Sequence, residues 1–89
     1  MKKQEVLEMV IKCIPYPQHI SDIDLESEEK AIRFTWRTDS KFRVSFESQR
    51  RLMVEEKKDG MLFGSNMAIL LEHLLWLELI NQGSDKLRK

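Results

Sequence analysis

Residues 66–81, NMAILLEHLLWLELIN, form the most apolar stretch of the chain and decide how the rest of it can pack. Eleven of the fourteen residues from 67 to 80 are apolar, and the other three are Glu72, His73 and Glu78. Successive residues of a helix are rotated by about 100°, so a helix this apolar carries apolar side chains on more than one side. The stretch predicts a helix that contacts two different surfaces.

At helical spacing the apolar residues separate into two stripes. The wide stripe is predicted to lie on the core, and it consists of Met67, Leu70, Leu71, Leu74 and Leu77. The narrow stripe lies on the opposite side of the helix and consists of Ile69, Trp76 and Ile80, with Glu72 and His73 at its margins. Leaving Trp76 in water would forgo roughly 4–6 kcal/mol of apolar burial. We therefore expect the narrow stripe to meet another protein surface, within this chain or in a second copy.

The same stretch is a poor membrane span. A helix that crosses a bilayer needs about 20 consecutive apolar residues with few charges. This run has fourteen residues, and two of them are glutamates. The sequence therefore predicts no membrane insertion.

Composition limits the classes of partner and the cellular compartment. The 89 residues carry 15 basic and 15 acidic side chains, so no overall field favours nucleic acid or anionic lipid. A single cysteine, Cys13, excludes an internal disulfide framework and a cysteine-based zinc cluster. Lysines at the amino terminus resemble the start of a secretory signal, but Glu5, Glu8 and Lys12 interrupt the apolar region that such a signal requires. We expect a cytoplasmic protein.

Residues 3–14 predict an amphipathic helix, because their apolar side chains fall within one arc at helical spacing. The helix is expected to end at Pro15 and Pro17, since proline disfavours helical geometry in the residue before it and lacks an amide hydrogen. Alternating apolar and polar residues predict strands at 20–26, 31–38, 41–47 and 51 to about 56. Short connections between these strands favour an antiparallel meander. Residues 61–63 fit either a short edge strand or the approach to the last helix.

The last helix is expected to begin at a cap formed by Ser65 or Asn66 and to end near Gly83, which leaves residues 84–89 as a flexible tail. The sequence thus predicts a single α+β domain of two layers over residues 1–89. Its order is helix, four-stranded antiparallel meander, helix. Both helices are predicted to cover the apolar face of the sheet.

The strand pattern also predicts a register. On the inner face, Leu25 is expected beside Ile32. One possible register puts Phe34 beside Phe46, and Phe46 can then face Leu52. The outer face would then carry opposite charges side by side, with Asp24, Arg33, Glu47 and Arg51 in one row and Arg43 beside Glu55. Exposed pairs of this kind are each worth at most about 1 kcal/mol. They are expected to specify register more than to stabilise the fold.

Two functions remain open from the sequence. The leading prediction is a small non-enzymatic protein–protein interaction module that forms a homodimer, or docks onto a partner protein, through Ile69, Glu72, His73, Trp76 and Ile80. The alternative is a nucleic-acid-binding accessory protein that uses the basic outer face of the central hairpin, through Arg37, Lys41, Arg43 and Arg50. The pleat argues against this alternative, because the aromatic residues that would stack on bases point to the other face.

No set of residues in the sequence predicts catalysis, a cofactor or a metal. The acidic run at 22–29 alternates as a strand and lacks the glycine turn of a calcium loop. His73 has no potential ligand four residues away, and Cys13 lies on the apolar arc of its helix. Neither a GxGxxG nor a GxxxxGK phosphate loop is present. We therefore expect no enzymatic activity, no metal site and no cofactor.

Overall fold

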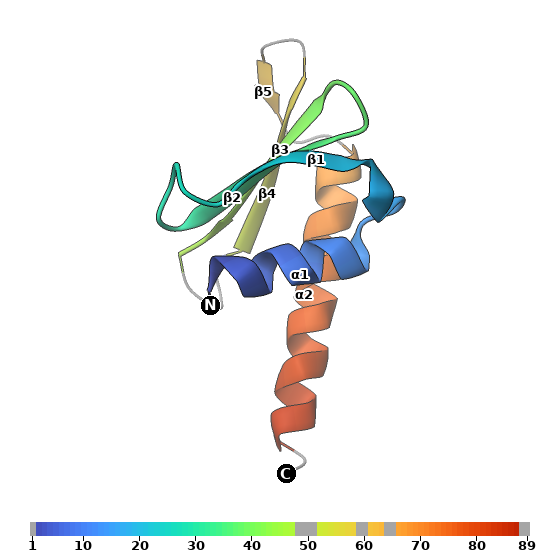
Figure 1. Cartoon of the computed structure of the whole chain (residues 1–89). Helices are drawn as coiled ribbons and strands as arrows, with labels where there is room; N and C mark the ends of the chain where they lie inside the picture. Colours follow the sequence, from blue (N-terminus) through green and yellow to red (C-terminus); the bar gives the residue numbers. More distant parts are fainter. Residues whose placement is uncertain (1, 48–51, 59–60, 64–65, 88–89) are drawn as a thin grey trace.

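The structure, a computed structural model, describes residues 2–47, 52–58, 61–63 and 66–87. Its elements are α1 (Lys3–Cys13), the 3-10 helix η1 (Pro17–His19), β1 (Ile20–Asp24), β2 (Ala31–Trp36), β3 (Ser40–Phe46), β4 (Leu52–Lys58), β5 (Met61–Phe63) and α2 (Asn66–Leu87) (Figure 1). The predicted α+β order of helix, antiparallel meander and helix is confirmed.

The helix α1 forms where the apolar residues have helical spacing. Its buried side chains are Val6, Leu7, Met9 and Val10. The amide of Ile14 still donates a hydrogen bond to the carbonyl oxygen of Val10, at 2.8 Å. Pro15 follows, and the chain leaves the helix there because the residue before a proline is disfavoured in helical geometry. The predicted end of this helix is confirmed.

The strands form one antiparallel sheet in the order β1-β2-β3-β4-β5. The four predicted strands are β1 to β4, and residues 61–63, for which the sequence left two interpretations, form the edge strand β5. β5 pairs only with Glu56, Lys57 and Lys58, at the end of β4. Among the described strands, none pairs with the remaining part of that edge of β4.

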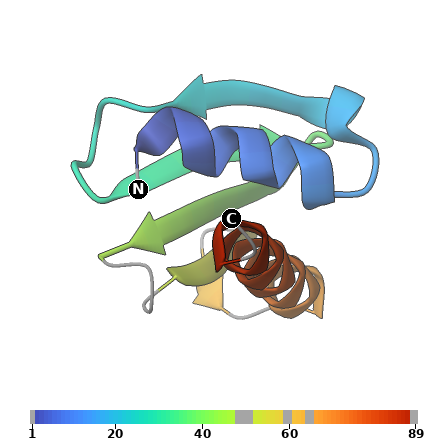
Figure 2. The same cartoon turned by 90° about the horizontal axis from the view of Figure 1, so that it is seen from below.

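Both helices lie on the apolar face of the sheet, and the core forms between them and the strands. In the view of Figure 2, α1 crosses in front of the strands while α2 is seen nearly end-on beside it, against β4. The helix α1, the sheet and the helix α2 all contribute fully buried side chains to this core. They include Val6, Val10, Ile32, Phe42, Val44, Leu52, Leu71 and Leu75.

The register between β2 and β3 differs from the predicted one. Phe34 lies opposite Phe42, with ring centroids 5.4 Å apart, and not beside Phe46. The sequence predicts that this strand reaches residue 38, whereas β2 ends at Trp36. Arg37 adopts a left-handed conformation with φ of 65°, and a loop of three residues returns the chain to β3. The shorter strand changes the pairing, so this part of the prediction is wrong.

Elsewhere the predicted neighbours are partly confirmed. The confirmed pairs are Phe46 with Leu52, Arg43 with Glu55, and Asp24 with Arg33. Arg33 lies opposite Arg43 and not beside Glu47, so the predicted row of alternating charges does not form. β1 ends one residue before Leu25, which was predicted to pair in the strand. Arg51 lies outside the described residues.

The helix α2 is longer than predicted. It continues through Gly83 to Leu87, because a single glycine costs a helix interior only about 1 kcal/mol and does not have to end it. Residues 84–87, which the sequence assigns to a tail, are helical, and residues 88–89 lie outside the described part of the chain. The carboxyl-terminal half of α2 extends past α1 and away from the sheet, and the longest dimension of the domain is 46 Å (Figure 1).

Candidate functional site

The helix α2 turns a different side to the core than the sequence predicts. The buried side chains among its described ones are Ala68, Leu71 and Leu75. Leu70 and Leu77, both predicted for the core, are 46% and 45% exposed. The buried side is thus rotated by about 100° from the predicted wide stripe. The prediction is wrong for these two leucines.

Glu72 lies on the side of α2 that faces the sheet. Its carboxylate Oε1 accepts a hydrogen bond from the amide of Val54 in β4, at 2.9 Å. Successive peptide groups of a strand point to alternate edges, so Val54 shares an edge with Glu56 and Lys58, which pair with β5. β5 does not extend as far as Val54, and Glu72 satisfies this amide in place of a strand. The sequence pattern placed Glu72 toward solvent because a carboxylate ordinarily faces water.

Trp76, predicted on the outer stripe, is half-buried and packs against the core. Of the five residues predicted to bind a partner, Ile69, His73 and Ile80 share one exposed side of α2. Glu72 and Trp76 lie instead toward the sheet and the core. The structure therefore brings together three of the five predicted residues.

The exposed side of α2 carries a continuous apolar surface, which we call the outward face. Its members are Ile69 (62% exposed), Leu70 (46%), His73, Leu77 (45%) and Ile80 (60%). Leu70, His73, Leu77 and Ile80 follow one another at intervals of three, four and three residues. This is the spacing of the positions at which two helices pack against each other in a coiled coil. The sequence predicts the two leucines in the core, so its pattern does not reveal them as members of this face.

The outward face is free of charged side chains over residues 66–82, the part of α2 whose side chains the structure describes. The two charged residues in this range, Glu72 and Glu78, point to other sides of the helix. Asn66 and Asn81 are the exposed polar residues near its two ends. The face is therefore apolar along its length, with His73 as its central polar group.

The helix α1 packs against a different side of α2. Lys12 Nζ donates to Glu78 Oε1 at 2.7 Å, and this hydrogen bond lowers the pKa of Glu78. Cys13 Sγ donates to the carbonyl oxygen of Leu74 at 3.8 Å. Leu74 and Glu78 are four residues apart and share a side of α2 that lies about 100° around the helix from the outward face. The outward face is therefore not covered by α1.

The outer face of the sheet carries a network of ion pairs centred on Glu28, in the loop before β2. Glu28 Oε2 accepts hydrogen bonds from Arg33 Nε at 2.8 Å and from Arg43 Nε at 2.9 Å, while its Oε1 accepts one from Arg43 Nη2 at 2.7 Å. The Nη1 of Arg43 also donates to Glu55, at 2.9 Å. The hydrogen bonds from Arg43 and Arg33 lower the pKa of Glu28 to about 2. The charge of Arg43 is thus neutralised within the chain.

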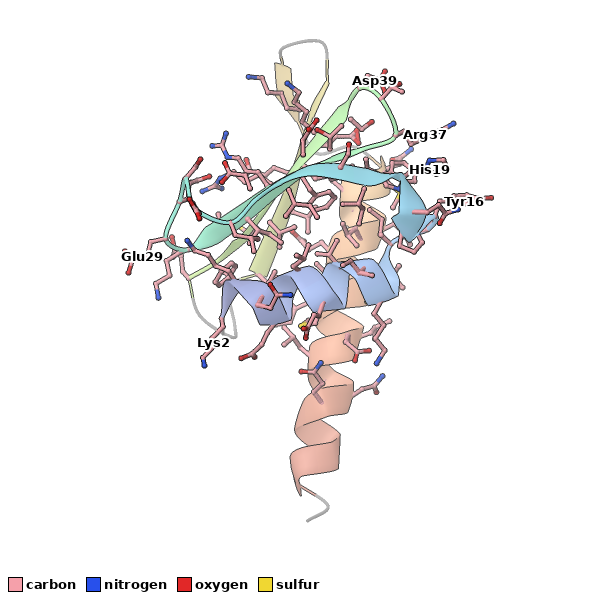
Figure 3. All side chains as sticks on the ribbon, viewed as in Figure 1. Lys2, Tyr16, His19, Glu29, Arg37 and Asp39 are labelled. Carbon is pink, nitrogen blue, oxygen red and sulfur yellow. The ribbon has the colours of Figure 1, made fainter. Side chains whose placement is uncertain are left out.

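Arg37, predicted to bind nucleic acid, lies at a corner of the domain. Its backbone amide donates to the carbonyl oxygen of His19 at 3.0 Å, and its guanidinium carbon lies 5.6 Å from the ring centroid of Trp36. The indole of Trp36 donates to the carbonyl oxygen of Pro15 at 2.9 Å. Figure 3 shows the side chains of Arg37, His19 and Tyr16 at this corner. Arg37 is therefore part of a corner held by one backbone hydrogen bond and by the hydrogen bond from the Trp36 indole.

The residues predicted to bind nucleic acid do not form one cluster. Lys41 lies on the outer face of β3 and Arg43 is held by carboxylates, while Arg50 lies outside the described residues. The structure adds Lys57, which lies directly opposite Lys41. Only the register of β3 and β4 reveals this pair, so the sequence alone does not single out Lys57.

Within the residues that the structure describes, no helix is long and apolar enough to cross a membrane. In the same part of the chain, no three His, Cys, Asp or Glu side chains are grouped so that they could hold a metal ion. Comparison of the chain with protein-family models, with curated proteins and with solved structures gives no match.

Proposed function

We propose that the chain is a small non-enzymatic protein–protein interaction module that forms a homodimer through the outward face of α2. One observation supports this most strongly: the aliphatic side chains Ile69, Leu70, Leu77 and Ile80 lie on one side of a helix and are each 45% to 62% exposed. A large contiguous apolar patch on a monomer ordinarily marks a surface that binds something. A partner that covers this patch removes it from water.

The exposed area sets the strength of the expected dimer. The four exposed fractions together equal roughly two whole aliphatic side chains, and burying one such side chain contributes about 1.5–3 kcal/mol. Two protomers would then gain about 6–12 kcal/mol in total. The lost freedom of two separate molecules costs about 4–15 kcal/mol. Because these ranges overlap, we expect a reversible dimer with a dissociation constant in the micromolar range or above.

A second copy suits this face because the face carries no charge. In a two-fold dimer the same patch meets itself, so a charged residue there would face an identical charge. Glu72 and Glu78 would not face their own copies in such a dimer. Glu72 accepts a hydrogen bond from β4, and Glu78 accepts one from α1. His73 places a hydrogen-bonding group in the middle of the face. The carboxyl-terminal half of α2 extends past α1 and away from the sheet (Figure 1).

Sedimentation velocity over a concentration series tests the proposal. We expect the wild-type chain to change from monomer to dimer as its concentration rises. Leu77→Glu is expected to remain monomeric, because it places a charge in the apolar seam without entering the core. Met53→Glu is the matched control, since Met53 is 56% exposed on the outer face of β4. A wild-type monomer at every concentration, or a dimer that Leu77→Glu leaves unchanged, would refute the proposal.

Nucleic-acid binding through Arg37, Lys41, Arg43 and Arg50 stays a prediction with less support. The carboxylates of Glu28 and Glu55 neutralise Arg43. A mobility-shift assay at low ionic strength decides it: binding that is lost when Arg37 and Arg43 are both changed to glutamate would favour this function.

We place the protein in the cytoplasm. The proposal rests on the single cysteine, Cys13, which is half-buried beneath α2 and has no second cysteine to pair with in the chain. Fractionation of cells that express the chain with a small tag tests it, and recovery in a membrane or extracellular fraction would contradict it.

A further inference from the structure

The register places two like-charged pairs side by side on the outer face of the sheet. Arg33 lies directly opposite Arg43, and Lys41 lies directly opposite Lys57. Like charges that face each other across neighbouring strands are destabilising. A negatively charged group bound between the two members of a pair would remove this repulsion.

The first pair has such a group, supplied by the chain. Glu28 binds both arginines, and Glu55 binds Arg43 as well. The second pair differs, because none of the ion pairs among the described residues includes Lys41 or Lys57. The ammonium groups of Lys41 and Lys57 can therefore bind an anion from solution.

The space above the two lysines is open to a ligand. An open hollow of about 880 Å³ lies over the outer face, and both Lys41 and Lys57 line it. Thr35, opposite Lys41 in β2, lines it as well. Asp22 and Asp24 line the side formed by β1. Glu28 and Glu55 line it too, but both are bound to the arginine pair. The lysine pair thus forms a basic end of the hollow, opposite an acidic side on β1.

We propose that Lys41 and Lys57 bind a phosphate group in this hollow, in the way that the Glu28 carboxylate binds Arg33 and Arg43. Residues directly opposite each other on one face have Cβ atoms about 4.5–5.5 Å apart, so two lysine ammonium groups can reach one tetrahedral anion. Lysine binds phosphate as a point charge. The acidic side repels further negative charge and suits a ligand whose remaining part carries hydroxyl or amino donors. This site is separate from the outward face of α2.

Titration of the ¹⁵N-labelled chain with inorganic phosphate at low ionic strength tests the site. We expect saturable shifts of the amide signals of Thr35, Lys41 and Lys57. Lys41→Gln and Lys57→Gln are each expected to weaken binding roughly fivefold, as the loss of one nearby charge implies. Lys30→Gln is the matched control, since Lys30 is an exposed lysine outside the hollow, and it should bind like wild type.

A second titration, with a short single-stranded oligonucleotide, distinguishes the two sources of the phosphate. Saturable binding of the oligonucleotide that depends on Lys41 and Lys57 supports the site with a nucleic-acid phosphate as its ligand. Lysine-dependent binding of inorganic phosphate alone supports it with a small phosphate compound. Shifts that only rise linearly, that sodium chloride reproduces, or that Lys30→Gln weakens as strongly would overturn the proposal.

Discussion

Replacing Glu28 by glutamine tests how the sheet tolerates Arg33 opposite Arg43. Glu28 receives four hydrogen bonds from the two guanidinium groups, at 2.7–3.1 Å. Glutamine keeps the size of the side chain and removes its charge. The variant therefore leaves two like charges facing each other, with only Glu55 to balance Arg43.

The structure limits the expected loss of stability to a modest value. The pKa of Glu28 falls from an ordinary 4.5 to about 2, mainly through its hydrogen bonds to Arg43 and Arg33. At 1.36 kcal/mol per unit this would correspond to roughly 3 kcal/mol in a shielded site. The side chain of Glu28 is 28% exposed and that of Arg33 is 56% exposed, so solvent screens the pairs. We expect Glu28→Gln to lower the free energy of unfolding by about 1–2 kcal/mol at pH 7.

Urea unfolding between pH 7 and pH 2 measures this loss without adding salt that would screen the charges. A lowered folded-state pKa stabilises the fold fully above the ordinary pKa, and this contribution is lost as the pH falls through the folded-state pKa. The gap between wild type and Glu28→Gln should therefore close from pH 4.5 down to about 2. Glu29→Gln is the control, because Glu29 is an exposed neighbour that points away from the sheet (Figure 3). Equal effects of the two substitutions, or a gap that persists unchanged at pH 2, would refute the reasoning.

Three further predictions concern α2 and its contacts. Glu72→Ala should destabilise the fold by about 1–3 kcal/mol and speed hydrogen exchange at the Val54 amide, whereas unchanged exchange there would contradict the edge contact. Trp76→Ala should cost about 2 kcal/mol in urea unfolding, less than the 3–5 kcal/mol of a fully buried aromatic residue, because Trp76 is only half-buried. Burial, and then the nearby charge of Glu78, raises the pKa of the Cys13 thiol, so alkylation at mildly alkaline pH should be slower than for a free cysteine and should speed up in urea; equal rates would contradict the burial.

The parts of the fold that follow from local periodicity could be predicted from the sequence. The apolar arc of α1 and the alternation of apolar and polar residues in β2 and β3 show which side chains are buried. Both patterns can be recognised from residues close together in the sequence. The pairing of Phe46 with Leu52 was predicted in the same way. The register of β2 and β3 could not be predicted from the sequence. It depends on the left-handed conformation of Arg37, which few residues other than glycine adopt.

The candidate site could be predicted only in part. Ile69, His73 and Ile80 were assigned to the exposed side of the last helix, where the structure places them. The inward position of Glu72 could not be predicted, since it depends on how far a distant edge strand extends along β4. With Glu72 at this edge, Trp76 lies toward the core, and Leu70 and Leu77 lie at the surface. A charged residue of a helix therefore does not mark the exposed side of that helix when the residue can accept a hydrogen bond from the edge of a strand.

The most direct test of the central proposal is a filtered nuclear Overhauser experiment on an equal mixture of isotope-labelled and unlabelled chains at high concentration. Only contacts between two copies give signals in such a spectrum. We predict signals between the methyl groups of Leu70, Leu77 and Ile80 in one copy and the same residues in the other. Absence of signals between copies, or signals from Met53 on the outer face of the sheet in place of these residues, would contradict a dimer formed through the outward face of α2.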